Sequence, residues 1–147
     1  MGLFDGGEEH PHSKIRRYII TVAAFVVVVG LFCWWMLRFH HEVKLAQTFL
    51  NDVSSGNLQQ AFAMWGHSDD YTYKDFLDDW SDSGYYGPVK SYHIDGVRDR
   101  GSGVVIVVEL SPFAPFPGDR DIEKHSKTKE ARLWVQFKDN TVTEAPP

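Results

Sequence analysis

The stretch Tyr18–Leu37, YIITVAAFVVVVGLFCWWML, is a continuous apolar run in which Thr21 is the single polar side chain. At 1.5 Å of rise per residue, a helix of this length spans about 30 Å, the hydrocarbon thickness of a bilayer. Four consecutive valines, Val26–Val29, put apolar side chains on every side of such a helix, whereas the core helix of a soluble protein is apolar along one face. The stretch therefore predicts one membrane-spanning helix.

Both ends of the run carry residue types that favour the membrane interface. Tyr18 stands at one end, and Trp34 and Trp35 stand near the other; Tyr and Trp rings are enriched at the level of the lipid headgroups. Arg38 follows the run, and its stem can stay in lipid while its charge reaches the headgroups. We expect these four residues to anchor a transmembrane helix over 18–39.

A cleaved signal peptide is the alternative to a permanent anchor. Its apolar region would have about 7–15 residues and would be followed by small residues at the cleavage site. This run is longer, and bulky residues end it, so the sequence favours an uncleaved signal anchor. Basic residues are more tightly clustered before the run, at residues 14–17, than after it, at Arg38 and Lys44. This bias predicts a cytoplasmic N-terminus and an extracytoplasmic C-terminal domain at the inner (cell) membrane.

The remaining chain divides into a short tail and one small domain. Residues 1–17 are Gly-rich, polar and short of core-forming residues, so we expect a disordered cytoplasmic tail. Residues 40–147 suffice for one domain, and they carry 17 Asp or Glu against 11 Lys or Arg. A domain of this charge is not expected to bind nucleic acid, which requires a basic surface. We also expect anionic lipid to repel it weakly.

Neither the cysteine content nor the histidine content predicts a metal or cofactor site. Cys33 is the only cysteine and lies within the apolar run, which excludes an intrachain disulfide and a thiolate site. The histidines of the domain are His40 and His41, whose side chains diverge on a helix, and the isolated His67, His93 and His125. The aspartates of residues 69–82 lack the alternating spacing of a calcium loop and instead predict a solvated acidic helix face.

Apolar periodicity predicts three helices followed by strands. Apolar residues recur at spacings of three and four over 43–53, 58–65 and 73–80, which is typical of amphipathic helices. Thr72 is the expected N-cap of the third helix. From Pro88 the period changes to two, and the β-branched run 104–110 and the segment 131–137 predict strands, with a short last strand over 141–143. Helices followed by an antiparallel meander indicate an α+β fold.

One long segment between the predicted strands is irregular. Residues 111–128, SPFAPFPGDRDIEKHSKT, contain three prolines and a charged stretch, so we expect an excursion without regular structure. Phe113 and Phe116 lie in it with little around them to bury them. They are candidates for contact with a partner or with the membrane surface.

The order of elements, together with FLNDVSSGNLQQAFAMW, YTYKDFLDDW and GPVKSYHIDGV, resembles the cone-shaped superfamily of nuclear-transport-factor-like, SnoaL-like and ketosteroid-isomerase-like domains. It is similar above all to short membrane-anchored bacterial members of unknown function. The resemblance implies helices packed on the concave face of a curved antiparallel sheet, with a pocket between them. A second resemblance, carried by Gly87-Pro88-Val89 and residues 132–137, is to the one-span assembly factors of cytochrome oxidase.

Tyr92, His93 and Asp95 form the most enzyme-like cluster, since Tyr and Asp act in the isomerase-like branch of that superfamily. However, His93 and Asp95 share one face of the predicted strand while Tyr92 points the other way, so a structural role is favoured. Aromatic residues predict core packing first, and an aromatic pocket or docking patch second. The candidates for that pocket or patch are Trp65, Tyr73, Trp80, Phe113, Phe116 and Trp134.

Two functions remain open. The first is a non-catalytic membrane-tethered domain that binds a membrane-protein partner or supports the assembly of a membrane complex. The second is a small-molecule pocket, or an isomerase- or hydratase-like enzyme, at the outer membrane face. The second function requires His93 or Asp95 to point into an enclosed cavity with another polar group within hydrogen-bond reach.

Overall fold

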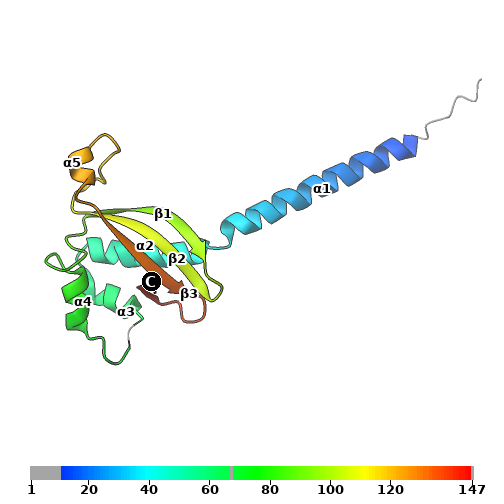
Figure 1. The fold of residues 1–147 in the computed structure, drawn as a ribbon. Helices are drawn as coiled ribbons and strands as arrows, with labels where there is room; N and C mark the ends of the chain where they lie inside the picture. The colour runs from blue at the N-terminus through cyan, green and yellow to red at the C-terminus, as the bar shows by residue number, and fades with distance from the viewer. Residues whose placement is uncertain (1–10, 67, 147) are drawn as a thin grey trace, which may run out of the picture. The chain divides into compact units, whose positions relative to one another are not determined.

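The computed structural model describes residues 11–66 and 68–146 of the chain, which form two compact units that meet between Arg38 and Phe39. The first unit is one helix, α1, over Pro11–Leu37. The second contains the remaining helices and a four-stranded sheet (Figure 1). The predicted α+β fold, with helices first and an antiparallel sheet after them, is confirmed.

The helix α1 is long and apolar enough to cross a membrane, and none of its apolar stretch is buried by the described chain. Its large apolar side chains range from 42% exposed at Val29 to 72% at Tyr18. Thr21 donates its hydroxyl hydrogen to the carbonyl of Arg17 at 2.9 Å, so the one polar side chain of the stretch is satisfied within the helix. The helix begins at Pro11, so residues 11–17 are helical where a disordered tail was expected; residues 1–10 lie outside the described part.

A turn at residues 38–39 ends α1, and α2 follows over His40–Ser54. Ala46, Phe49, Leu50 and Val53 are buried along one face of α2, as the periodicity predicts. Gly56 then adopts a φ of 80°, a left-handed conformation that glycine tolerates and that ends helices.

Two short helices complete the helical layer, α3 over Leu58–Met64 and α4 over Tyr73–Trp80. Thr72 caps α4 as predicted: its hydroxyl oxygen accepts the N–H of Asp75, whose carboxylate accepts the N–H and O–H of Thr72. These hydrogen bonds hold the pKa of Asp75 below its usual value. The cap is therefore intact at neutral pH and weakens as the pH falls and Asp75 becomes protonated.

The sheet is a meander of β1 (Ser91–Asp99), β2 (Gly103–Ser111), β3 (Lys129–Gln136) and β4 (Val142–Glu144), in that spatial order and antiparallel throughout. The segment between β2 and β3 contains one helical turn, α5 (Ile122–His125). Alternate residues of β2, from Val104 to Leu110, join the core with α2. The intervening residues point to the opposite face, which we call the outer face of the sheet.

Aromatic rings pack the helices of the second unit against one another. Phe49 of α2 lies 5.3 Å from the ring of Trp65, 5.1 Å from that of Trp80 and 6.2 Å from that of Phe76, measured between centroids. All four are buried, with Phe49 and Phe76 fully inaccessible. The pair with Trp65 is stacked and the other two are edge-to-face; aromatic pairs of both kinds add about 0.5–1.5 kcal/mol each beyond the burial of area.

We predict that Phe49→Ala lowers the free energy of unfolding by about 3–5 kcal/mol, because it leaves a cavity at the centre of this cluster. Thermal unfolding of the full chain in detergent, followed by near-ultraviolet circular dichroism, measures the change. The control is Phe137→Ala, since Phe137 is 37% exposed and its removal leaves no cavity. Equal losses for the two variants would contradict this account of the core.

Candidate functional site

The structure separates the three residues of the enzyme-like cluster. His93 and Asp95 lie on the same side of β1, with Nε2 and Oδ1 3.9 Å apart, and their side chains are 63% and 44% exposed. Tyr92 points toward α2, where its hydroxyl donates to Oδ1 of Asn51 at 2.9 Å. Burial raises the pKa of Tyr92, so its hydroxyl remains a donor. His93 and Asp95 thus form an exposed pair on one face of β1, and Tyr92 contacts α2 from the other face.

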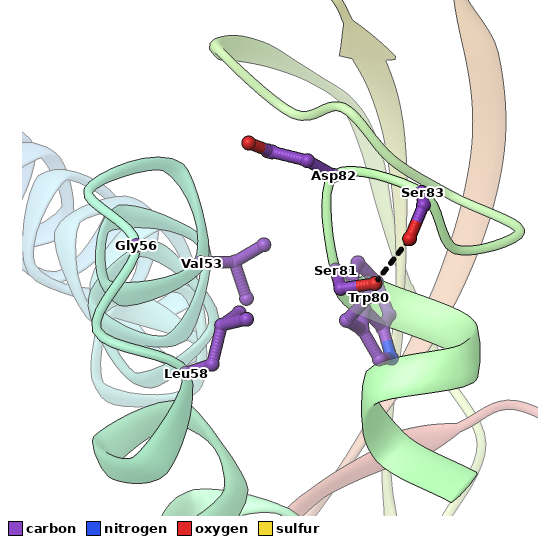
Figure 2. A pocket seen from close by; sticks show the side chains of 7 residues that line it. All are labelled: Val53, Gly56, Leu58, Trp80, Ser81, Asp82 and Ser83. Atoms are coloured by element: carbon purple, nitrogen blue, oxygen red, sulfur yellow. Dashed lines mark hydrogen bonds between the residues drawn. The ribbon is translucent and has the colours of Figure 1, made fainter. Parts of the chain in front are cut away.

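A cleft of about 520 Å³ lies at the surface between the end of α2 and the end of α4 (Figure 2). Val53, Gly56 and Leu58 line one side, and residues 80–83 line the other. Asp82 is its one ionisable residue; its side chain is 80% exposed and lies 3.6 Å from Nζ of Lys90. Because no acid and base face each other across it, this cleft carries no catalytic pair.

A second cleft, of about 450 Å³, is lined by Ser68, Asp70, Tyr71 and the aspartates of α4. The hydroxyl of Tyr71 donates to Oδ2 of Asp79 at 2.6 Å. Burial, and then this hydrogen bond, raise the pKa of Tyr71 well above its ordinary value. The phenol therefore stays protonated and fixes Asp79, while the other carboxylates form the solvated acidic face expected from the sequence.

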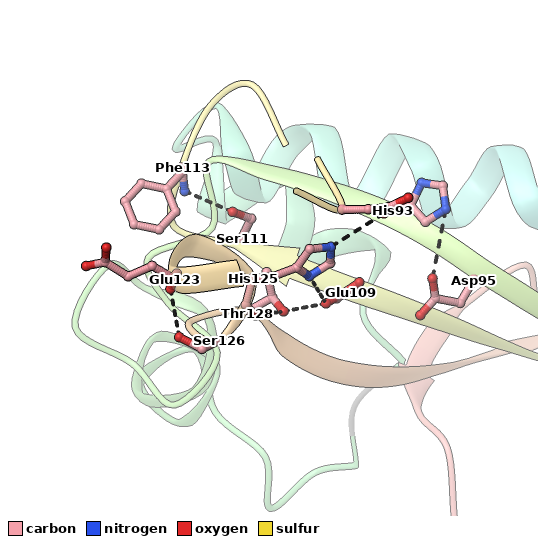
Figure 3. Close-up of polar contacts among 10 residues, drawn as sticks. His93, Asp95, Glu109, Ser111, Phe113, Glu123, His125, Ser126 and Thr128 are labelled. Atoms are coloured by element: carbon pink, nitrogen blue, oxygen red, sulfur yellow. Dashed lines mark hydrogen bonds and ion pairs between the residues drawn. The ribbon is translucent and has the colours of Figure 1, made fainter. Parts of the chain in front are cut away.

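The polar cluster on the outer face was not predicted (Figure 3). Glu109 stands in the central strand β2 with its side chain 23% exposed. Nδ1 of His125 lies 3.1 Å from its Oε1, and the hydroxyl of Thr128 donates to the same oxygen. The ring of Phe116 lies against both imidazoles, 5.7 Å from that of His93 and 5.9 Å from that of His125. The excursion, residues 112–128, is thereby attached to the sheet.

The contacts of His125 and Thr128 with Glu109 are structural contacts. A histidine oriented by a carboxylate is half of a nucleophile-activating arrangement, and the other half would be a hydroxyl or thiol at Nε2. In the described chain, Nε2 of His125 makes no hydrogen bond and lies 4.0 Å from the exposed carboxylate of Asp119. No group of three or more His, Cys, Asp or Glu side chains in the described ranges could hold a metal ion.

The excursion differs from its expected form in two respects. It contains the helical turn α5, and Phe113 and Phe116 are half-buried, because the excursion folds back on the outer face. Nζ of Lys124 and Nζ of Lys127 each lie 5.9 Å from the Phe113 ring. The large apolar side chain that this segment exposes is Ile122, which is 79% exposed.

The other candidates for a pocket or docking patch occupy different environments. Trp65 and Trp80 are core residues, and Tyr73 is half-buried at a shallow surface cleft beside α3. Trp134 is half-buried on the outer face, where it crowds Gly103: a Cβ there would lie 2.8 Å from its ring. These residues therefore do not form one site.

The sequence could not reveal the outer-face cluster, because Glu109 of β2 and His125 are 16 residues apart and an irregular segment separates them. The available signal was the acidic residue in the β-branched run 104–110, since a carboxylate in a central strand needs a partner.

Comparison with known protein families, with curated proteins and with solved structures finds nothing that matches this chain. The resemblances to the cone-shaped superfamily and to the oxidase assembly factors stay predictions from the sequence.

We predict that Glu109→Ala loosens the excursion, because it removes the common acceptor of His125 and Thr128. Hydrogen bonds to charged groups contribute about 1.5–3 kcal/mol, so amide hydrogen exchange over 112–128 should rise about tenfold or more, with β2 and β3 unchanged. Glu130→Ala is the matched control, since Glu130 pairs with Glu109 in the register and contacts Arg132 instead. Unchanged protection in the Glu109 variant would refute the attachment.

Proposed function

We propose that this protein is a single-pass membrane-anchored domain without catalytic activity that presents a docking surface to a protein partner and supports a membrane complex. The observation that carries the proposal is the contrast between the two units. The apolar surface of α1 is uncovered by the described chain, while the second unit has a complete core of its own. An uncovered apolar helix requires lipid or another protein to shield it.

The packing of the second unit argues for binding at its surface rather than catalysis inside it. Where the resemblance implies a pocket between helices and sheet, the described structure has one core cluster of buried apolar side chains from both. His93 and Asp95 are exposed and border neither of the two clefts described above. The isomerase- or hydratase-like alternative requires His93 or Asp95 to point into an enclosed cavity, and these exposed residues do not meet that requirement.

The excursion is the favoured docking surface. It offers one large and strongly exposed apolar side chain, Ile122, and the Phe113 ring that Lys124 and Lys127 flank. Its ties to Glu109 hold it in one conformation, which lowers the entropic cost of binding. Its chemistry suits a partner with an apolar centre and acidic residues around it.

The position of the excursion within its unit also favours this role. Nε2 of His41 contacts Oδ1 of Asn140 at 3.1 Å, so the first turn of α2 lies at the end of the sheet that holds the β3–β4 turn. Tyr92 contacts Asn51 near the other end of α2, where β1 begins and the excursion leaves β2. The excursion and the entry of the chain at Phe39 are thus separated by about the length of α2, roughly 20 Å.

The membrane anchor predicts that the full chain stays in the pellet when membranes are washed with alkaline carbonate, because a spanning helix is held by its apolar surface. Immunoblotting of pellet and supernatant measures the partition. Replacing Val26 and Val28 by Asp should move the chain to the supernatant, whereas Val26→Leu with Val28→Leu should not. Release of the unaltered chain would contradict the anchor.

The docking surface predicts that a photo-reactive benzoylphenylalanine at Ile122 gives a single major protein adduct in intact cells. The matched control carries the same group at Lys74, which is exposed on α4. A second variant, Phe113→Ala with the photo-reactive group still at 122, should lose most of the adduct. Equal adducts at 122 and 74, or none at 122, would refute docking at the excursion.

A further inference from the structure

Two turns meet at the end of the second unit where the chain enters from α1. The β1–β2 turn and the β3–β4 turn are joined by the N–H of Phe137, which donates to the carbonyl of Ser102 at 3.2 Å. The β3–β4 turn also contacts the first turn of α2 through Asn140 and His41. We call these residues, 39–44, 98–102 and 137–141, the entry end.

The entry end carries three exposed cations on its two turns. Arg98, Arg100 and Lys138 are exposed, and none of them forms an ion pair within the described part of the chain. The carboxylate of Asp99 between the two arginines accepts the N–H of Gly101 at 2.8 Å, so it is engaged in the turn. Phe137, next to Lys138, is 37% exposed.

The ranges of the entry end contain four basic and three acidic residues, a formal charge of +1, whereas the other residues of 40–147 contain seven basic and fourteen acidic ones, a formal charge of −7. Asp82 lines the cleft that Val53 and Gly56 form at the far end of α2 (Figure 2), and Asp75, Asp78 and Asp79 belong to α4. The far end of α2 is about 20 Å from its start, which is about two Debye lengths at physiological salt. The net negative charge of the unit thus lies outside the entry end.

The connection between the units is too short to hold the entry end away from a bilayer. Residues 38 and 39 alone separate the end of α1 from α2, and two residues span at most about 7 Å. If α1 crosses the membrane, the start of α2 lies within roughly one Debye length of the headgroups in any orientation of the second unit.

From these observations we infer that the entry end binds anionic phospholipid headgroups through Arg98, Arg100 and Lys138, an inference that rests on the membrane anchorage proposed above. Guanidinium groups make paired hydrogen bonds with phosphate, and each basic side chain near an anionic surface contributes about 1 kcal/mol. The contact turns the acidic α4 and the excursion away from the lipid. It replaces the expectation that the domain as a whole is repelled, because the membrane faces the basic end.

A spin-label experiment tests this inference. Because Cys33 is the only cysteine of the sequence, one substitution removes the native thiol. In a Cys33→Ala background, a nitroxide is attached at Ser102→Cys and the full chain is reconstituted into vesicles of phosphatidylcholine, with or without phosphatidylglycerol. We expect the label to be shielded from a water-soluble relaxation agent in the phosphatidylglycerol vesicles. Each cation replaced by Ser should shift the docked population about fivefold, and Arg98, Arg100 and Lys138 replaced together should abolish the shielding.

The control replaces Lys74, Lys90 and Lys124 by Ser, which changes the net charge equally but away from the entry end. In this control variant the label at 102 should stay shielded. Loss of the shielding in the control would overturn the inference. A label equally accessible to the relaxation agent in both kinds of vesicle would also overturn it. A label on Cys33 itself tests the anchor separately. If dissolved oxygen relaxes the label on Cys33 strongly, as it does for a label in lipid, while the label at 102 is not shielded, the headgroup contact alone is refuted. If the label on Cys33 is exposed to water, both proposals are overturned.

Discussion

The packing of Phe49 against Trp65 and Trp80 is the interaction on which the second unit depends. One ring from α2 contacts the end of α3 and the end of α4 at centroid distances near 5 Å, and on the other side the helices meet the buried residues of β2 and β3. Because a close-packed core has few alternative arrangements, this contact fixes the direction of α2 across the sheet. The direction of α2 in turn separates the entry end from the excursion.

Because the interior of the second unit is filled by its core, a binding function falls to its surface. In many small α+β domains the space between helices and sheet holds a ligand, but here buried apolar side chains from both occupy it. What remains accessible is a set of chemically distinct surfaces. They are the basic entry end, the acidic face of α4 and the excursion with its exposed Ile122. Surfaces of this kind, on a unit that two residues connect to an apolar helix, support the proposal of an anchored binding domain.

The excursion illustrates how a polar contact can order an irregular segment. Glu109 would be costly in a central strand if its carboxylate had no partner, and His125 and Thr128 supply the partners from a segment rich in proline and charge. The same contacts bury half of Phe113 and Phe116, which the sequence suggests are exposed. The large apolar side chain left for a partner is therefore Ile122, a residue that periodicity does not distinguish.

The amino-acid sequence by itself determined the apolar helix, the three amphipathic helices, the cap at Thr72 and the strands, because these follow from periodicity, hydrogen bonding within one turn and β-branching. It also separated Tyr92 from His93 and Asp95, since neighbours on a strand face opposite ways. Only the tertiary structure decided the rest. The partnership of Glu109 with His125, the contact of His41 with Asn140 across 99 residues and the separation of basic from acidic surface all depend on long-range packing. No local pattern encodes which distant side chains a folded core brings together.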